Sequence, residues 1–187
     1  MQPRSQKRPT LMEFSAAAFL LAAPSSQAVA QSARGYAIPQ SLRIAHEETV
    51  EQLSILANRK GPVGEEARKA LVVFKRHIDR EQEFILPPLT LLPRLADGKV
   101  TPDMAWALPM LDRVRAEREE IFQEHTKITD ALNALTVAAA RAHDRTAKAF
   151  AESAAADSLN DMEVLEPTLL LLGDILHSKL PAGGSIR

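Results

Sequence analysis

The strongest constraint on the fold is an apolar stripe with helical spacing that is interrupted by ionisable side chains. In residues 63–86 the stripe passes through Phe74, meets His77 and Glu81, and continues at Phe84. Steps of three and four residues place these side chains on one face of an α-helix. A helix buries its apolar face, and a buried charge is costly unless it is paired or bound to a metal. The histidine and the glutamate therefore need a specific partner.

Three other segments show the same pattern, and each has its polar interruption at one level. Pro and Gly separate the segments, as at Gly61-Pro62 and Pro87-Pro88, and none of them has a sustained period-2 pattern. Short connections between long amphipathic helices favour antiparallel neighbours. We expect an all-α fold, an antiparallel up-down four-helix bundle with short extra helices after helices 2 and 4. The other interrupted segments are 41–58 with His46, 110–139 with His125, and 142–166 with Asp157 and Asp161.

Composition supports a helical core and limits the chemistry. Hydrophobic residues make up 45% and aromatic residues only 4%, so the chain has a core that favours helix over strand. The net charge is -1 without a basic cluster in the body of the chain, which argues against nucleic-acid binding. The absence of cysteine excludes disulfides, thiolate metal sites and a cysteine nucleophile. A metal site would use nitrogen and oxygen ligands, which suit Fe, Mn or Zn.

The chain also contains an internal repeat. When "HIDREQEFILPP" is placed over "DSLNDMEVLEPT", His77 falls on Asp157, Glu81 on Asp161 and Pro87 on Pro167. The preceding helices match as well, because "AHEETVEQL" resembles "EHTKITDAL". The repeat predicts two helical hairpins, each with one polar residue on its first helix and an i, i+4 pair on its second. Side chains four residues apart share a helix face and can hold one ion.

The residues that interrupt the stripes resemble a known family. His46, the pair His77-x-x-x-Glu81 before Pro87, and "EH" with His125 are similar to the hemerythrin-like, or HHE cation-binding, domain. The resemblance extends over 41–180. It implies a four-helix bundle that holds a non-haem di-iron centre, with Zn or Mn as other possible metals. It also implies a small diatomic or peroxide ligand, or sensing or storage of oxygen, nitric oxide, peroxide or iron.

The fourth segment departs from the family pattern. The family has another His-x-x-x-Glu there, whereas this chain has Asp157-x-x-x-Asp161. The resemblance implies the metal ligands His46, His77, Glu81, His125, Asp157 and Asp161. Two alternatives stay open: a degenerate bundle that binds one metal or none and acts as an interaction module, and a di-iron oxidase or peroxidase. Glu83 and Glu163 fall beside the stripe, and His143 and His177 lie off its level.

The ends of the chain have a different composition from the body. Residues 1–30 contain basic residues, an apolar run and Ala28-Val29-Ala30, the order of a secretory signal peptide. We expect an exported protein, periplasmic in a Gram-negative bacterium, with a disordered leader in a cytoplasmic protein as the alternative. Residues 31–40 are predicted to be a linker and 181–187 a disordered tail. The apolar run is too short to span a bilayer as a helix.

Overall fold

The computed structural model describes residues 35–180, and this part of the chain is helical, with no β-strand. The predicted leader and tail, residues 1–30 and 181–187, lie outside the described residues. The long helices are α1 (Gln40–Ala57), α2 (Pro62–Arg80), α5 (Arg118–Arg141), α6 (Arg145–Asn160) and α7 (Glu166–Lys179). The shorter elements are η1 (Glu81–Ile85), η2 (Pro87–Leu91), α3 (Leu92–Ala96), η3 (Pro102–Ala107), α4 (Leu108–Ala116) and η4 (Asp161–Leu165).

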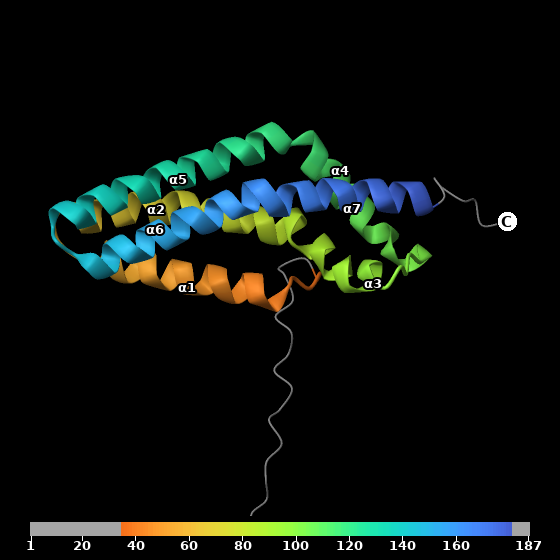
Figure 1. Cartoon of the computed structure of the whole chain (residues 1–187), viewed down its shortest axis with the longest axis horizontal. Helices are drawn as coiled ribbons and strands as arrows, with labels where there is room; N and C mark the ends of the chain where they lie inside the picture. Colours follow the sequence, from red (N-terminus) through yellow and green to blue (C-terminus); the bar gives the residue numbers. More distant parts are fainter. Residues whose placement is uncertain (1–34, 181–187) are drawn as a thin grey trace, which may run out of the picture.

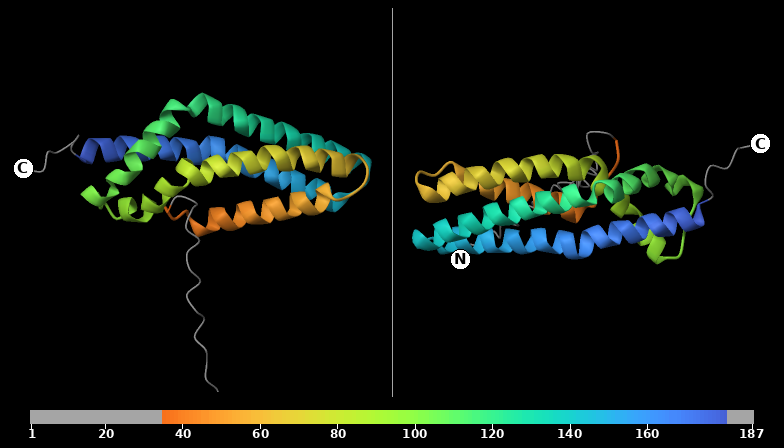
Figure 2. Two further views of the ribbon diagram at one scale, coloured as in Figure 1. Left: turned by 180° about the vertical axis from the view of Figure 1, so that it is seen from behind. Right: turned by 90° about the horizontal axis from the view of Figure 1, so that it is seen from above.

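Four of the long helices lie side by side. α1 packs on α2, α2 on α5, and α5 on α6, whereas α1 and α6 touch over a much smaller area. The connections α1–α2 and α5–α6 turn at the same end of the molecule (Figures 1 and 2). The opposite end is closed by α3, α4 and α7, and α7 continues the direction of α6 (Figure 1).

Local sequence explains both of these turns. Gly61 has a φ of 84°, which favours glycine, and Pro62 begins α2, where a missing N–H is tolerated. Before α6, the Asp144 side chain accepts a hydrogen bond from the Ala147 N–H and caps the helix. The turn between the helices therefore depends on glycine and proline in the first hairpin and on a side-chain cap in the second.

Each hairpin contains a π-helical turn at the end of its second helix. The two turns lie at equivalent positions of the internal sequence repeat. η1 begins at Glu81 and η4 at Asp161, and in each the N–H five residues later bonds to the carboxylate residue's own carbonyl. Pro87 and Pro167 follow at the same spacing. Proline has no N–H, and its ring clashes with the carbonyl four residues earlier, so a regular α-helix cannot pass these points. The wider turn accommodates the proline in both hairpins.

The helix boundaries differ from the sequence prediction at one place. The continuous helix expected over 110–139 is interrupted at Glu117, whose φ of -98° and ψ of 14° separate α4 from α5. Glu117 pairs with Arg80 and Arg113, so tertiary ion pairs accompany the break. Neither Gly nor Pro marks this break, which is why the sequence pattern did not reveal it.

The apolar side chains form two clusters with a polar layer between them. One cluster fills the hairpin end and includes Phe74, Ile128 and Leu132. The other fills the opposite end and includes Phe84 and Ile121. His77, Glu81 and His125 fall between these positions in sequence and are themselves buried. The polar interruptions of the stripes thus come together in one layer between the two apolar clusters.

The stripe expected on the fourth helix, at steps of three and four residues through Phe150, Ala154, Asp157, Asp161 and Val164, is only partly buried. Asp157 and Val164 were expected to face the core, but both are exposed. Ala154 is buried as expected, and Ala151 and Ser158 are buried as well. The small side chains of α6 allow a face that includes Ser158, rather than Asp157, to pack on α5.

Other described features bear on the predicted domain limits. Ile38, in the predicted linker 31–40, is buried in the second cluster, and Tyr36 stacks on Trp106 with ring centroids 4.5 Å apart. Within 35–180, no helix combines the length and the apolar character needed to cross a membrane.

Candidate metal centre

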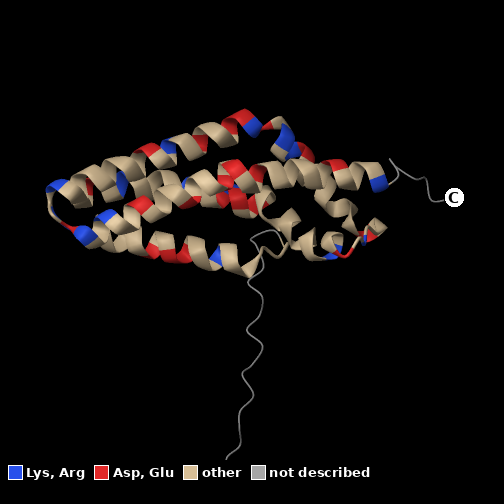
Figure 3. Ribbon diagram, viewed as in Figure 1, with Lys and Arg blue, Asp and Glu red and all other residues tan. Residues whose placement is uncertain are grey.

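The six residues predicted as ligands line one cavity. The cavity has a volume of about 130 Å³ and lies in the polar layer, with walls from α1, α2, α5 and α6. His46 comes from α1, His77 from the last turn of α2, and Glu81 from the start of η1. His125 comes from α5, Asp157 from α6 and Asp161 from the start of η4. Figure 3 shows acidic residues gathered in the middle of the molecule, where α6 passes into α7.

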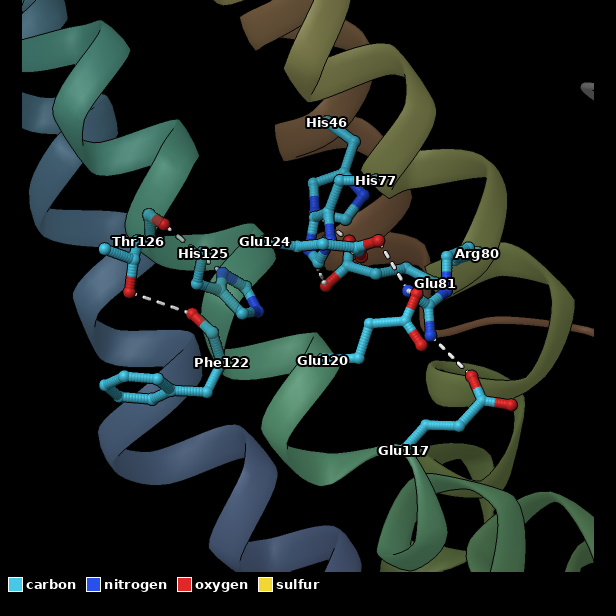
Figure 4. Close-up of polar contacts among 11 residues, drawn as sticks. His46, His77, Arg80, Glu81, Glu117, Glu120, Phe122, Glu124, His125 and Thr126 are labelled. Atoms are coloured by element: carbon cyan, nitrogen blue, oxygen red, sulfur yellow. Dashed lines mark hydrogen bonds and ion pairs between the residues drawn. The ribbon is translucent and has the colours of Figure 1, made fainter.

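Glu81 is at the centre of the arrangement. Its side chain is 1% exposed, and its two carboxylate oxygens face different imidazoles. Oε1 lies 3.2 Å from His77 Nε2, and Oε2 lies 3.3 Å from His46 Nε2. The close-up in Figure 4 shows His46, His77 and Glu81 converging on the same space. A buried carboxylate between two imidazole nitrogens can be stabilised by protons or by a metal cation.

The hydrogen bonding of these atoms favours a metal cation. Glu81 Oε1 and Oε2, His77 Nε2 and His46 Nδ1 are buried without a hydrogen-bond partner. The approaches of 3.2 and 3.3 Å between oxygen and nitrogen therefore lack the alignment of hydrogen bonds. Orphaned buried polar atoms are rare in folded proteins. Nitrogen and carboxylate oxygen are suitable ligands for Fe, Mn or Zn, so the donor set fits a metal ion.

Two sets of three residues could each hold one ion. The first set is His77, Glu81 and His125, and the second is His46, Glu81 and Asp161. Within each set the ligand atoms lie within 4.8 Å of one another. Glu81 belongs to both sets. Each set combines residues from both hairpins.

Asp157 lines the cavity but belongs to neither set, and its side chain is exposed. The next residue, Ser158, is buried and lies on the cavity wall instead. Its Oγ is 3.3 Å from His125 Nδ1 and also accepts a hydrogen bond from the Thr129 hydroxyl. The fourth helix therefore presents a hydroxyl to the centre where the repeat predicted an aspartate.

The charges of the first hairpin support one another. Burial alone would raise the pKa of Glu81, but the neighbouring imidazoles of His77, His46 and His125 lower it below the ordinary value. Burial opposes charge on His77 as well, yet Glu81 and Glu124 raise its pKa above the ordinary value. Without a metal, this pair is an ionised glutamate beside a histidine that favours its protonated form.

The second hairpin is arranged in the opposite way. Burial and the nearby His77 lower the pKa of His125 to about 4, so this imidazole is neutral. Burial and the charge of Glu81 raise the pKa of Asp161 to about 7. A carboxyl with this pKa is partly protonated near neutral pH, and it must lose the proton before it can bind a metal. Asp161 is therefore a weaker ligand than Glu81 below neutral pH.

Sequence reasoning missed three polar residues around the centre: Ser158, Glu124 and Arg80. Glu124 Oε2 lies 3.2 Å from His77 Nδ1, and Arg80 binds the other oxygen of Glu124. The sequence "EH" placed Glu124 next to His125, and this was a usable signal. Its contact is with a different histidine, on another helix, which only the packing of α5 on α2 reveals.

Four other polar residues that the sequence placed beside or off the stripe do not line the cavity. Glu83 pairs with Arg113, and Glu163 is exposed. His143 is exposed in the α5–α6 turn with a φ of 55°. His177 is exposed and pairs with Asp112 at 2.7 Å.

No protein-family model matches the chain, and no curated protein or solved structure is significantly similar to it. The case for a function therefore depends on the fold and on the geometry of the buried histidines and carboxylates.

Proposed function

We propose that this chain is a hemerythrin-like non-haem iron protein with a two-metal centre. In this proposal α1, α2, α5 and α6 form the antiparallel four-helix bundle. One ion would be held by His77, Glu81 and His125, and the other by His46, Glu81 and Asp161, so that Glu81 would serve both. Bundle cores are a common place for di-iron carboxylate sites. The observation that carries the proposal is the buried Glu81, which offers each of its two oxygens to a different imidazole.

The residues of this chain would have distinct tasks at such a centre. The three imidazoles and the two carboxylates bind the ions, while Leu42, Phe74 and Ile128 line the cavity with apolar surface and limit the access of water. Phe74 also meets the His46 ring edge-on, with centroids 6.0 Å apart, and restricts its orientation. A bound iron pair would supply redox chemistry and open coordination positions for oxygen, nitric oxide or peroxide.

The test is a measurement of metal content on the purified protein. After reconstitution with Fe(II), we expect about two iron atoms per chain and the visible absorption of a di-iron centre. Glu81→Gln should lose both. A stoichiometry of one or less in the wild-type protein, without that absorption, would contradict the two-metal centre.

A second candidate is a degenerate bundle that binds one ion such as Zn, or none, and acts as an interaction or structural module. It is favoured by the exposed Asp157 and by the raised pKa of Asp161, which leave the second set with weaker ligands. A melting temperature that falls on chelation in the wild type but not in His77→Ala would rule out its metal-free form. Unchanged melting of both proteins would support it.

A further inference from the structure

The three imidazoles of the centre differ in what their second nitrogen contacts. His77 Nδ1 lies 3.2 Å from a carboxylate oxygen of Glu124, and His125 Nδ1 lies 3.3 Å from the hydroxyl of Ser158. His46 Nδ1 is buried with no hydrogen-bond partner. A carboxylate only accepts hydrogen bonds, so His77 donates through Nδ1–H and its Nε2 faces Glu81. Among the Nδ1 atoms of these three histidines, only that of His77 has a charged partner.

From this contact we propose that Glu124 is a positioning residue of the metal centre. It fixes the His77 ring as the Nδ1–H tautomer, so that Nε2 is presented to the ion, and it makes that nitrogen a stronger ligand. The inference rests on the proposed metal-binding function. Carboxylates that accept from metal-ligating histidines have this effect in general.

Glu124 is itself held on both of its oxygens. Oε2 contacts His77, while Oε1 lies 2.5 Å from Arg80 Nη1. The side chains of Glu124 and Arg80 are 13% and 14% exposed, so the contact between their charges is only weakly screened by solvent. Because Arg80 is three residues after His77 on α2, one helix positions both partners of Glu124.

Arg80 is in turn fixed by other groups. Its Nη2 lies 2.5 Å from Glu117, its Nη1 lies 3.0 Å from Glu120, and its guanidinium lies 5.8 Å from the centre of the Phe84 ring. Figure 4 shows Arg80 between Glu117 and the group formed by Glu124 and His77. The ion-pair network thus continues from the surface to the imidazole and leaves Glu124 little freedom to move away.

Glu120 provides a matched control, since it is on the same helix and pairs with the same Arg80 atom. Its side chain is 60% exposed, and among the described residues no hydrogen bond or ion pair joins it to His77. We would compare the full-length wild type with Glu124→Leu, Glu124→Gln and Glu120→Leu, each checked for folding by circular dichroism. Fe(II) affinity would be measured anaerobically by competition with a chromophoric chelator. The His77 tautomer would be read in the metal-free protein from long-range ¹H–¹⁵N NMR correlations, at a pH high enough for the imidazole to be neutral.

We expect Glu124→Leu to weaken Fe(II) binding about 10- to 100-fold and to abolish the preference for the Nδ1–H tautomer. Glu124→Gln keeps an acceptor oxygen and should restore the tautomer and part of the affinity, while Glu120→Leu should match the wild type. Equal affinity in Glu124→Leu and the wild type would overturn the positioning role alone. Equal losses in Glu124→Leu and Glu120→Leu would overturn it too, by showing a general charge effect. A wild type that binds no Fe(II) would overturn the proposed function and this inference with it.

Discussion

The two helical hairpins share a π-helical turn at the same place but have different polar side chains around it. Residues 40–86 and residues 118–166 each contain a π-helical turn that begins at a carboxylate and precedes a proline. In the first hairpin that carboxylate, Glu81, is 1% exposed and lies between two imidazoles. In the second, Asp161 is only half-buried, and Asp157 is exposed. The two hairpins thus share the π-helical turn, but they do not place equivalent carboxylates in equivalent environments.

The difference shows that backbone and ligands follow different constraints. In both hairpins a proline lies six residues after the carboxylate, and the wider turn accommodates its missing N–H although the surrounding side chains differ. The ligand set depends on side-chain length and on which face of the helix packs. Glutamate has one methylene more than aspartate and reaches the centre of the layer, and the packing face of α6 presents Ser158 rather than Asp157. The second set is therefore the weaker one.

The largest effect is expected at the residue that belongs to both sets. Glu81→Gln keeps the shape of the side chain but removes the charge that both ions need, so Fe(II) affinity should fall by more than about 100-fold at both positions. Glu83→Gln, two residues away and paired with Arg113, is the control and should bind like the wild type. Metal analysis after dialysis measures the result. A variant that retains one ion would show that Glu81 serves a single position.

Asp161→Asn should weaken metal binding while it increases the stability of the metal-free fold. We expect it to lose one of two ions, because an amide replaces a carboxylate in the second set only. The metal-free variant should be more stable than the wild type by about 2 kcal/mol at pH 8, after allowance for solvent around this half-buried carboxyl.

The sign of this stability difference follows from the pKa. Folding raises the pKa of Asp161 to about 7, so between the unfolded value and pH 7 the folded state holds the additional proton. Stability from this group is full at low pH and declines as the pH rises through 7. The advantage of Asp161→Asn should therefore be near zero at pH 4 and complete by pH 8. Urea unfolding at these two pH values measures it, and a constant difference would contradict the raised pKa.

Metal binding should depend on pH in the opposite direction. Asp161 and His77 both have raised pKa values in the metal-free protein, and both must lose their protons to bind an ion. Below pH 7, affinity at the Asp161 position should fall by up to about tenfold per pH unit. Calorimetry in buffers of different ionisation enthalpy would count the protons released. Affinity that is constant from pH 6 to pH 8 would contradict this prediction.

The smallest effect is expected at Asp157. Its carboxylate is exposed and belongs to neither set, so Asp157→Asn should change Fe(II) affinity by less than about threefold and leave the stoichiometry unchanged. Competition with a chelator measures the affinity. Loss of one ion in this variant would restore Asp157 as a ligand and would make the two hairpins more alike than the structure shows.

Much of the fold and of the candidate site could be predicted from local patterns. The 3.6-residue period located the long helices, and the interruptions in the stripes located His77, Glu81 and His125, all of which are buried. The register of α6 was not predictable in this way, because an alanine-rich helix offers several faces of similar apolar character. The break at Glu117 was missed because it carries no glycine or proline signal.

By itself, the sequence determined the long helices, the points at which prolines interrupt a regular α-helix, and the level at which histidines and carboxylates interrupt the core. These features depend on residue type and spacing within one segment. Only the tertiary structure decided that Glu81 faces two imidazoles, that Ser158 replaces Asp157 at the cavity wall, and that Glu124 contacts His77. Such contacts depend on the rotation and offset of one packed helix against another, and these are set by side-chain packing across the whole interface.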